Sequence, residues 1–245
     1  MAAAALEVAA RLNARFRLGR PSNDLAAAGV LLHQLDGYED QKQPWLPCDM
    51  GDGPKGACSV YQAAHWSGSL VNKAQRGVYA TCHGGLVFAP VPAASAVECA
   101  YPRDGSTQGK GCSPWCTGVR ANGLTSEPNG CCWPAAQLER MLVEAASHGS
   151  DRNGHNEVVV DAKEIARQLP HSIEAFVFHR TCHGTAVGQK DGKGALVADY
   201  GARREAARTN HAAFVASFPG LDAAAVPLLE LDLASGSDSP FRPVA

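Results

Sequence analysis

The segment His155-Asn156-Glu157-Val158-Val159-Val160 decides the fold class, because a polar turn there runs directly into a β-strand. Its three valines are β-branched, and a run of such residues favours a pleated, buried backbone. A second apolar run, 173–178, follows a connector that ends in Leu169-Pro170. The two runs predict two strands of a buried sheet. The carboxylate of Glu157 then stands at the mouth of the first strand and faces the adjoining cleft.

The composition is that of a folded, soluble protein. The chain has 245 residues, of which 45% are hydrophobic and 19% are charged. This length is enough for one large domain with a sizeable core. The formal net charge of −2 predicts neither a nucleic-acid-binding surface nor one for acidic membranes. No apolar run approaches the roughly 18 residues that a membrane span needs.

Shorter signals outline the rest of an α+β domain. Apolar runs predict strands at 30–35, 69–71, 85–89, 97–101 and 226–233, with 85–89 and 97–101 paired as a hairpin. Helical periodicity predicts one helix that starts at Pro134, with Leu138, Met141, Leu142 and Ala145 on its apolar face, and another over about 203–217. We therefore predict one domain over residues 21–234. Its central, mostly antiparallel sheet has about six strands, flanking helices and long disulfide-pinned loops.

The two ends of the chain are expected to flank this domain. Residues 1–20 are rich in alanine and contain four arginines and one acid, Glu7. The spacing of six residues predicts a helix that ends near Gly19-Arg20-Pro21, where proline stops it: Leu6, Ala9, Ala10, Leu12, Asn13 and Phe16. This composition is typical of an organelle transit peptide, or of an amphipathic helix that caps the fold or docks to a partner. Residues 235–245 are expected to be a disordered tail or one held against the surface.

Nine cysteines are unusual for a chain of this composition. Most lie among glycines and prolines, where disulfides fit better than buried thiols: Cys48, Cys58, Cys112, Cys116, Cys131 and Cys132. The odd number leaves one thiol over, and Cys99, in the strand-like segment 97–101, is predicted to be a buried free thiol. We therefore expect a secreted protein or one of another oxidising compartment, with an organelle lumen as the alternative.

Cysteine and histidine also recur near predicted strand ends, at Cys82, His83, His179, Cys182 and His183. Zinc binds such side chains, but a structural zinc site usually has two closely spaced ligand pairs. Only His179 and His183 have that spacing, and a disulfide between Cys82 and Cys182 explains the same residues. Disulfides likewise explain the cysteines of segment 112–132, so we predict no metal cofactor. Motifs for a nucleophilic serine or a phosphate-binding loop are not found in the sequence.

Three polar residues on predicted strands resemble the pattern of the ADP-ribosyltransferase fold. Members of that family place a His or Arg on the first core strand, a Ser or Tyr on a second, and a Glu at the start of a third. The matching positions here are His33, Ser69 and Glu157. The run from Glu157 to 173–176 also resembles the family's last hairpin.

The resemblance implies NAD as the cofactor and either ADP-ribosyl transfer or NAD hydrolysis as the activity. By this resemblance, His33 would contact the ribose of NAD, and Ser69, with Ser67 as a further candidate, would support the nicotinamide side. Glu157 would hold the nicotinamide ribose and stabilise the cationic transition state. His155 stands where the family usually has a second Glu or Gln, which leaves the acceptor of any transfer open.

A non-catalytic function stays open beside this activity, so the sequence does not decide whether the chain is an enzyme. Four tryptophans lie near predicted loops: Trp45, Trp66, Trp115 and Trp133. In a lectin-like binder they would line a carbohydrate-binding face, because aromatic rings stack on sugars. Alternatively, they fill gaps beneath the loops. A rigid assembly subunit would instead dock to a protein partner through the N-terminal helix and the C-terminal tail. We expect no nucleic-acid partner.

Overall fold

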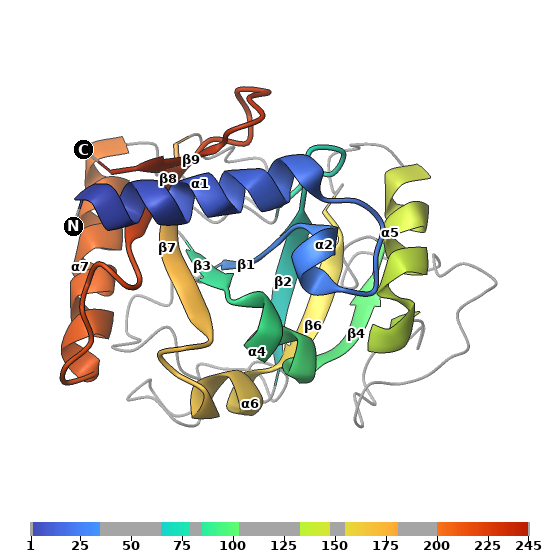
Figure 1. The fold of residues 1–245 in the computed structure, drawn as a ribbon, viewed down its shortest axis with the longest axis horizontal. Coiled ribbons are helices and arrows are strands. Elements are labelled where there is room, and N and C mark those ends of the chain that lie inside the picture. The colour runs from blue at the N-terminus through green and yellow to red at the C-terminus, as the bar shows by residue number, and fades with distance from the viewer. Residues whose placement is uncertain are drawn as a thin grey trace, which may run out of the picture.

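The computed structural model describes residues 2–34, 65–78, 85–102, 133–147, 155–180 and 200–244, and Figure 1 shows their arrangement. Their strands form one nine-stranded sheet in the order β5-β4-β6-β2-β1-β3-β7-β8-β9. The strands are β1 (Val30–Gln34), β2 (His65–Val71), β3 (Gly85–Phe88), β4 (Val97–Tyr101), β5 (Trp133–Pro134), β6 (Glu157–Asp161), β7 (Ile173–His179), β8 (Leu228–Leu231) and β9 (Phe241–Pro243). All neighbouring pairs are antiparallel except β7 and β8, which are parallel.

Helices pack on both faces of this sheet. They are α1 (Ala2–Leu18), α2 (Leu25–Ala28), α4 (Pro90–Ala96), α5 (Leu138–Ser147), α6 (Ala162–Arg167) and α7 (Tyr200–Ser217), with a 3-10 turn, η2, at Ala135–Gln137. The helix α1 contacts β1, β8 and β9 and forms one core with them, which we call the α1 core. The other five helices contribute to a second core, which we call the opposite core.

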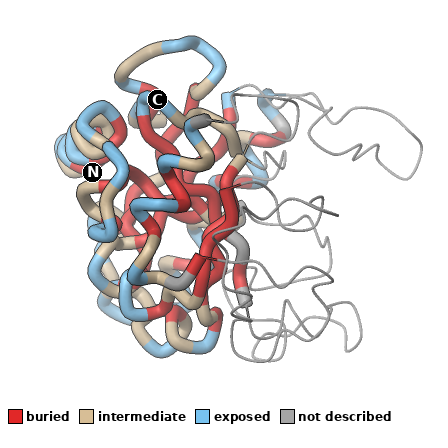
Figure 2. The backbone as a smooth tube through the Cα atoms, turned by 90° about the vertical axis from the view of Figure 1, so that its right-hand side faces the viewer, coloured by how far each residue is buried: buried red, intermediate tan, exposed pale blue. Residues whose placement is uncertain are grey.

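Alternation along the strands separates these two cores. Successive side chains of a strand point to opposite faces of a sheet. On β2, Leu70 belongs to the opposite core and its neighbour Val71 to the α1 core. On β1, Leu31 and Leu32 divide in the same way. Figure 2 shows the resulting buried backbone running through the middle of the molecule, with exposed segments on the outer helices and turns. The face of any strand residue can therefore be read from its neighbours.

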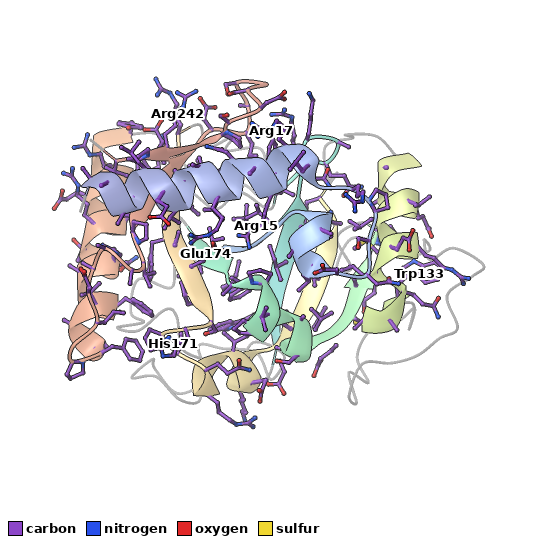
Figure 3. The ribbon with its side chains drawn as sticks, viewed as in Figure 1. Arg15, Arg17, Trp133, His171, Glu174 and Arg242 are labelled. Carbon is purple, nitrogen blue, oxygen red and sulfur yellow. The ribbon has the colours of Figure 1, made fainter. Side chains whose placement is uncertain are left out.

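A β-bulge aims the buried Glu174 at α1. Pairing of β3 with β7 passes from Val87–Ala175 to Phe88–Ile173, so Glu174 is an extra residue on β7, and bulges re-aim side chains. Its two carboxylate oxygens accept hydrogen bonds from Arg11 Nε at 2.6 Å and Arg15 Nη2 at 2.5 Å. Figure 3 shows Arg15 and Glu174 between α1 and the sheet. These ion pairs fasten the helix to β7.

The C-terminal residues form the last strand of the sheet. Strand β9 pairs with β8, and Phe241 packs edge-on against Phe16 with ring centroids 6.5 Å apart. The amide of Asn13 donates to the Phe241 carbonyl and accepts the Phe241 N–H, both at 2.9 Å. The Arg76 guanidinium lies 5.0 Å from the Phe16 ring centroid and donates to the Ser237 carbonyl. The two ends of the chain are thus bound to each other.

The two outermost strands of the sheet are short, and each contains a proline. Strand β5 has two residues and ends at Pro134, and β9 has three and ends at Pro243. Proline has no N–H to give to a neighbouring strand, so it is typical of sheet edges.

The predicted α+β class with a mostly antiparallel sheet is confirmed, although the described sheet has nine strands rather than about six. The predicted hairpin of 85–89 with 97–101 is wrong, because β3 pairs with β1 and β7 while β4 pairs with β5 and β6. Helix α4 lies between them and has proline in its first turn, where the missing N–H costs little. The helix predicted from Pro134 starts at Leu138, after η2.

Cys99 is buried in β4. The other eight cysteines lie outside the described residues, so the disulfide pinning of the loops stays a prediction.

Candidate functional site

Asn156 continues the pairing between β2 and β6 with its side chain. Its Oδ1 accepts the Leu70 N–H at 2.7 Å, and its Nδ2 donates to the Leu70 carbonyl at 2.8 Å and to Gln75 Oε1 at 2.5 Å. The last backbone pair of the two strands is Gly68 with Val158. One side-chain amide therefore takes the place of both backbone partners of Leu70. It holds the start of β6, and with it Glu157, against β2.

Replacing Asn156 by alanine is expected to lower the free energy of unfolding by about 2–3 kcal/mol, because the buried N–H and carbonyl of Leu70 lose their partners. Urea denaturation measures the change. Asn210→Ala, on the partly exposed face of α7, is the control and should stay within about 0.5 kcal/mol of wild type. Equal stability of the two variants would show that Asn156 does not clamp the strands.

Glu157 and Ser69 lie side by side on one face of the sheet. Val158 belongs to the opposite core, and a Cβ on Gly68 would meet Leu31 of that core. The next residue on each strand, Glu157 and Ser69, therefore points to the other face. Tyr101 pairs with Glu157 from β4 and shares that face. Across the strands, Glu157 stands between Ser69 and Tyr101, and we call these three buried residues the Glu157 row.

The Glu157 row borders the α1 core. Leu32, a residue of that core on β1, pairs with Ser69, and Val71 of the same core lies two residues further along β2 on the same face. The row can supply two kinds of chemistry. A carboxylate accepts hydrogen bonds from ligand hydroxyls, and a fixed negative charge stabilises a developing cation.

His33 lies on the opposite face of the sheet. It pairs with Gly68, and its imidazole stacks on Trp66 with ring centroids 4.8 Å apart and on Phe88 with centroids 6.0 Å apart. Both aromatic residues belong to the opposite core. The sheet itself therefore separates His33 from Ser69 and Glu157, and the three residues do not line one cleft.

Two further parts of the predicted NAD site can be placed. Strands β6 and β7 are separated by β2, β1 and β3, so the segment 157–176 does not form a hairpin. The backbone of Ser67 lies on β2, but its side chain lies outside the described residues. Of the predicted site residues whose side chains are described, the structure brings together Ser69 and Glu157 but not His33. Tyr101 and Asn156 were not among the predicted site residues, although Asn156 stands beside Glu157 in the turn before the valine run.

A second polar cluster lies at the carboxyl ends of the parallel strands β7 and β8. Glu230 accepts hydrogen bonds from the Tyr200 hydroxyl at 2.5 Å and from Arg180 Nη1 at 2.9 Å. Burial raises the pKa of Glu230, but these hydrogen bonds outweigh it and hold the pKa below its usual value. Arg203 donates to the carbonyl oxygens of His179 and Arg180. Such strand ends often bind ligands, but here the contacts tie β7, β8 and α7 to one another.

His179 makes the stability of the fold depend on pH. Burial, and then the positive charge of Arg203, lower the pKa of His179 from 6.5 to about 4. The unfolded chain takes up the proton near pH 6.5 and the folded chain near pH 4, so stability is lost as pH falls through this window. The full loss is about 3 kcal/mol. Burial also lowers the pKa of His211, which adds to the slope in the same direction.

We expect His179→Gln to flatten the dependence of the urea midpoint on pH between about 6.5 and 5, a range above most carboxylate pKa values. His171→Gln, at an exposed position, is the control and should keep the wild-type slope. A wild-type slope in the His179 variant would show that this imidazole is not the group that titrates.

The outer face of α1 exposes large apolar side chains. Leu6 is 59% exposed and Leu18 is 65% exposed, with Ala10 exposed and Ala14 partly exposed between them. Residues four apart are neighbours on a helix surface, so these four form one strip, which we call the outer ridge. Of the residues that predicted this helix, Ala9, Leu12 and Phe16 are buried and Asn13 is partly buried. Leu6 and Ala10 instead lie on the outer face.

Other predicted features are buried or fall outside the described residues. Trp66 and Trp133 are buried in the opposite core, whereas Trp45 and Trp115 lie outside the described residues. Within the described ranges, no group of three or more His, Cys, Asp or Glu residues is arranged to hold a metal ion. The neighbours of His179 in the predicted zinc motif, Cys182 and His183, are not described. No helix of the described ranges has both the length and the apolar character needed to cross a membrane.

Comparison of the chain with protein-family models, with curated proteins and with solved structures finds no match, so its function has to be inferred from its own residues.

Proposed function

We propose that the chain is a non-catalytic assembly subunit that docks to a protein partner through the outer ridge of α1. The observation that carries this proposal is the exposure of Leu6 and Leu18 on a helix whose other face is locked into the core. Single exposed leucines are ordinary. Two of them in one strip with two alanines make a continuous apolar surface, and such surfaces are typical of interaction sites.

The C-terminal segment lies beside this helix and widens the surface. Asn13 binds the backbone of Phe241, and Arg76 connects Phe16 to Ser237. Because these contacts hold α1 and the C-terminal segment together, we expect little conformational entropy to be lost in ordering this surface when a partner binds. The N-terminal helix and the C-terminal segment, which were both predicted to bind a partner, would therefore do so at a single surface.

A photo-crosslinking amino acid at Ala10 tests this proposal in an extract of the source cells. We expect it to capture one recurring polypeptide, and the double variant Leu6→Glu/Leu18→Glu to abolish the capture. The matched control is the same probe at Val143, an aliphatic residue that is 56% exposed on α5. Capture of the same polypeptide from Val143, or none from Ala10, would overturn the proposal.

NAD cleavage at the Glu157 row is the second candidate function. The adjacency of Ser69 and Glu157 supports it, because a carboxylate beside a hydroxyl suits a ribose whose glycosidic bond is breaking. His33 has no part in this version. If NAD cleavage is the function, adding NAD raises the melting temperature of the protein and nicotinamide is released. Glu157→Gln should then abolish release, while Glu139→Gln, at an exposed position on α5, leaves it unchanged. No thermal shift and no nicotinamide would rule this function out.

We infer from the cysteines in loop-like sequence that the chain matures in an oxidising compartment. Thiol titration of the denatured, unreduced protein is then expected to find one reactive thiol per chain, with four disulfides accounting for the rest of the nine cysteines. Nine reactive thiols would instead place the chain in a reducing compartment.

A further inference from the structure

We propose that the occupant of the outer ridge is an amphipathic helix with acidic flanks, an inference that rests on the docking function proposed above. The shape of the ridge favours a helix. Side chains four apart form an oblique row, and such rows pack into the grooves of a second helix. Alanine at the two middle positions lets the second helix approach closely, while Leu6 and Leu18 stand at the ends as larger contacts.

The charges around the ridge favour an acidic partner. Arg17 and Arg20 are exposed, and their side chains make no ion pair with another described residue. The only acid on α1 is Glu7. Nearby, Lys73 and Arg76 form ion pairs with one acid, Asp238, and the charge of Arg17 also contributes to lowering the pKa of that carboxyl. The end of α1 nearest Leu18 therefore carries more positive than negative charge.

The same charges disfavour a second copy of the chain as the occupant. In a two-fold pair each partner presents the same patch, so two outer ridges would bring two basic helix ends to one interface. The interface would then contain two Glu7 carboxylates and four guanidinium groups, two from Arg17 and two from Arg20, and so a net positive charge. An acidic helix meets those groups with opposite charge, which favours association and selects against basic partners.

The size of the surface predicts a modest affinity. Helix α1 has 17 residues, which corresponds to about 25 Å of length. One helix laid across it forms an interface at the small end of the range for specific complexes. We therefore expect binding that is reversible and sensitive to salt.

Fluorescence anisotropy with the full chain and synthetic helical peptides of about 20 residues tests the inference. One peptide has leucine and alanine on one face and glutamate on its flanks, and a second carries lysine in place of glutamate. We expect the glutamate peptide to bind at least about tenfold more tightly than the lysine peptide. Arg17→Glu/Arg20→Glu should remove this preference, whereas Arg140→Glu, at an exposed position on α5, should keep it. Leu6→Glu/Leu18→Glu should abolish binding of both peptides.

Other results separate the inference from the docking function. Equal binding of both peptides, lost in the leucine variant, would overturn the acidic partner and leave docking intact. Binding only to vesicles with phosphatidylserine would replace the protein partner by a lipid surface and overturn both proposals. Dimerisation in sedimentation velocity that Leu6→Glu/Leu18→Glu abolishes would identify a second copy and overturn the inference. If neither peptide, vesicles nor a second copy binds, and the crosslinker at Ala10 captures nothing, both proposals fail.

Discussion

Replacing Glu174 by leucine is expected to lower the free energy of unfolding by about 3–5 kcal/mol, as is typical when one partner of a buried ion pair is removed. Glu174 is 9% exposed and Arg15 only 14% exposed, so Arg15 would keep a charge in a poorly hydrated place. Arg11, which is 49% exposed, would reach water more easily. Urea denaturation followed by circular dichroism gives the change, and the loss of α1 packing should shift the midpoint without changing its slope.

Two further variants show whether the ion pair is the cause. Glu164→Gln removes a carboxylate that pairs with Arg167 in a more exposed place, and should cost less than about 1 kcal/mol. Glu174→Leu combined with Arg15→Met should recover much of the loss, because apolar residues of similar volume often replace buried ion pairs well. A Glu174→Leu variant within about 1 kcal/mol of wild type would show that α1 is not held by these ion pairs.

Replacing Phe16 by alanine is expected to cost about 3–5 kcal/mol of unfolding free energy, the usual range for a fully buried phenylalanine. Phe16 is 0% exposed and contacts both Phe241 and Arg76. The change should therefore also loosen β9, which hydrogen–deuterium exchange detects as faster exchange of the Phe241 amide. Leu6→Ala truncates an exposed side chain on the same helix and should stay within about 0.5 kcal/mol of wild type. If the Phe16 variant is as stable as wild type and the exchange of the Phe241 amide is unchanged, the C-terminal strand does not depend on the packing of α1.

The class of the fold could be predicted from local patterns, but the order of its strands could not. The valine run after Glu157 and the apolar run 173–178 both form strands, because β-branched and aromatic residues fit a buried sheet at either place. Their separation by three other strands depends on contacts between distant parts of the chain. Pro90 and Pro92 follow β3 closely and lie in the first turn of α4, but proline at such a place is equally typical of a strand end and of a helix start.

The candidate site shows the same limit. Assigning His33 and Ser69 to opposite faces requires the pairing of His33 with Gly68, which no residue pattern reveals. Once the pairing is known, the alternation of side chains along each strand gives the face of the sheet on which His33 and Ser69 each lie. Glu174 was a signal that could have been used, because an acid within an otherwise apolar strand needs a partner. The Leu6-x3-Ala10-x3-Ala14-x3-Leu18 spacing was visible too, but only burial shows that this strip faces outward.

The proline in each border strand has a consequence for how the molecule behaves in concentrated solution. Fibril growth proceeds when the free rim of one sheet templates a strand from another molecule, and both rims described here end in a residue without a donor. Crowding should therefore not convert this protein into cross-β aggregates by way of its native rims. Binding of a different protein is instead expected at the exposed leucines of the N-terminal helix.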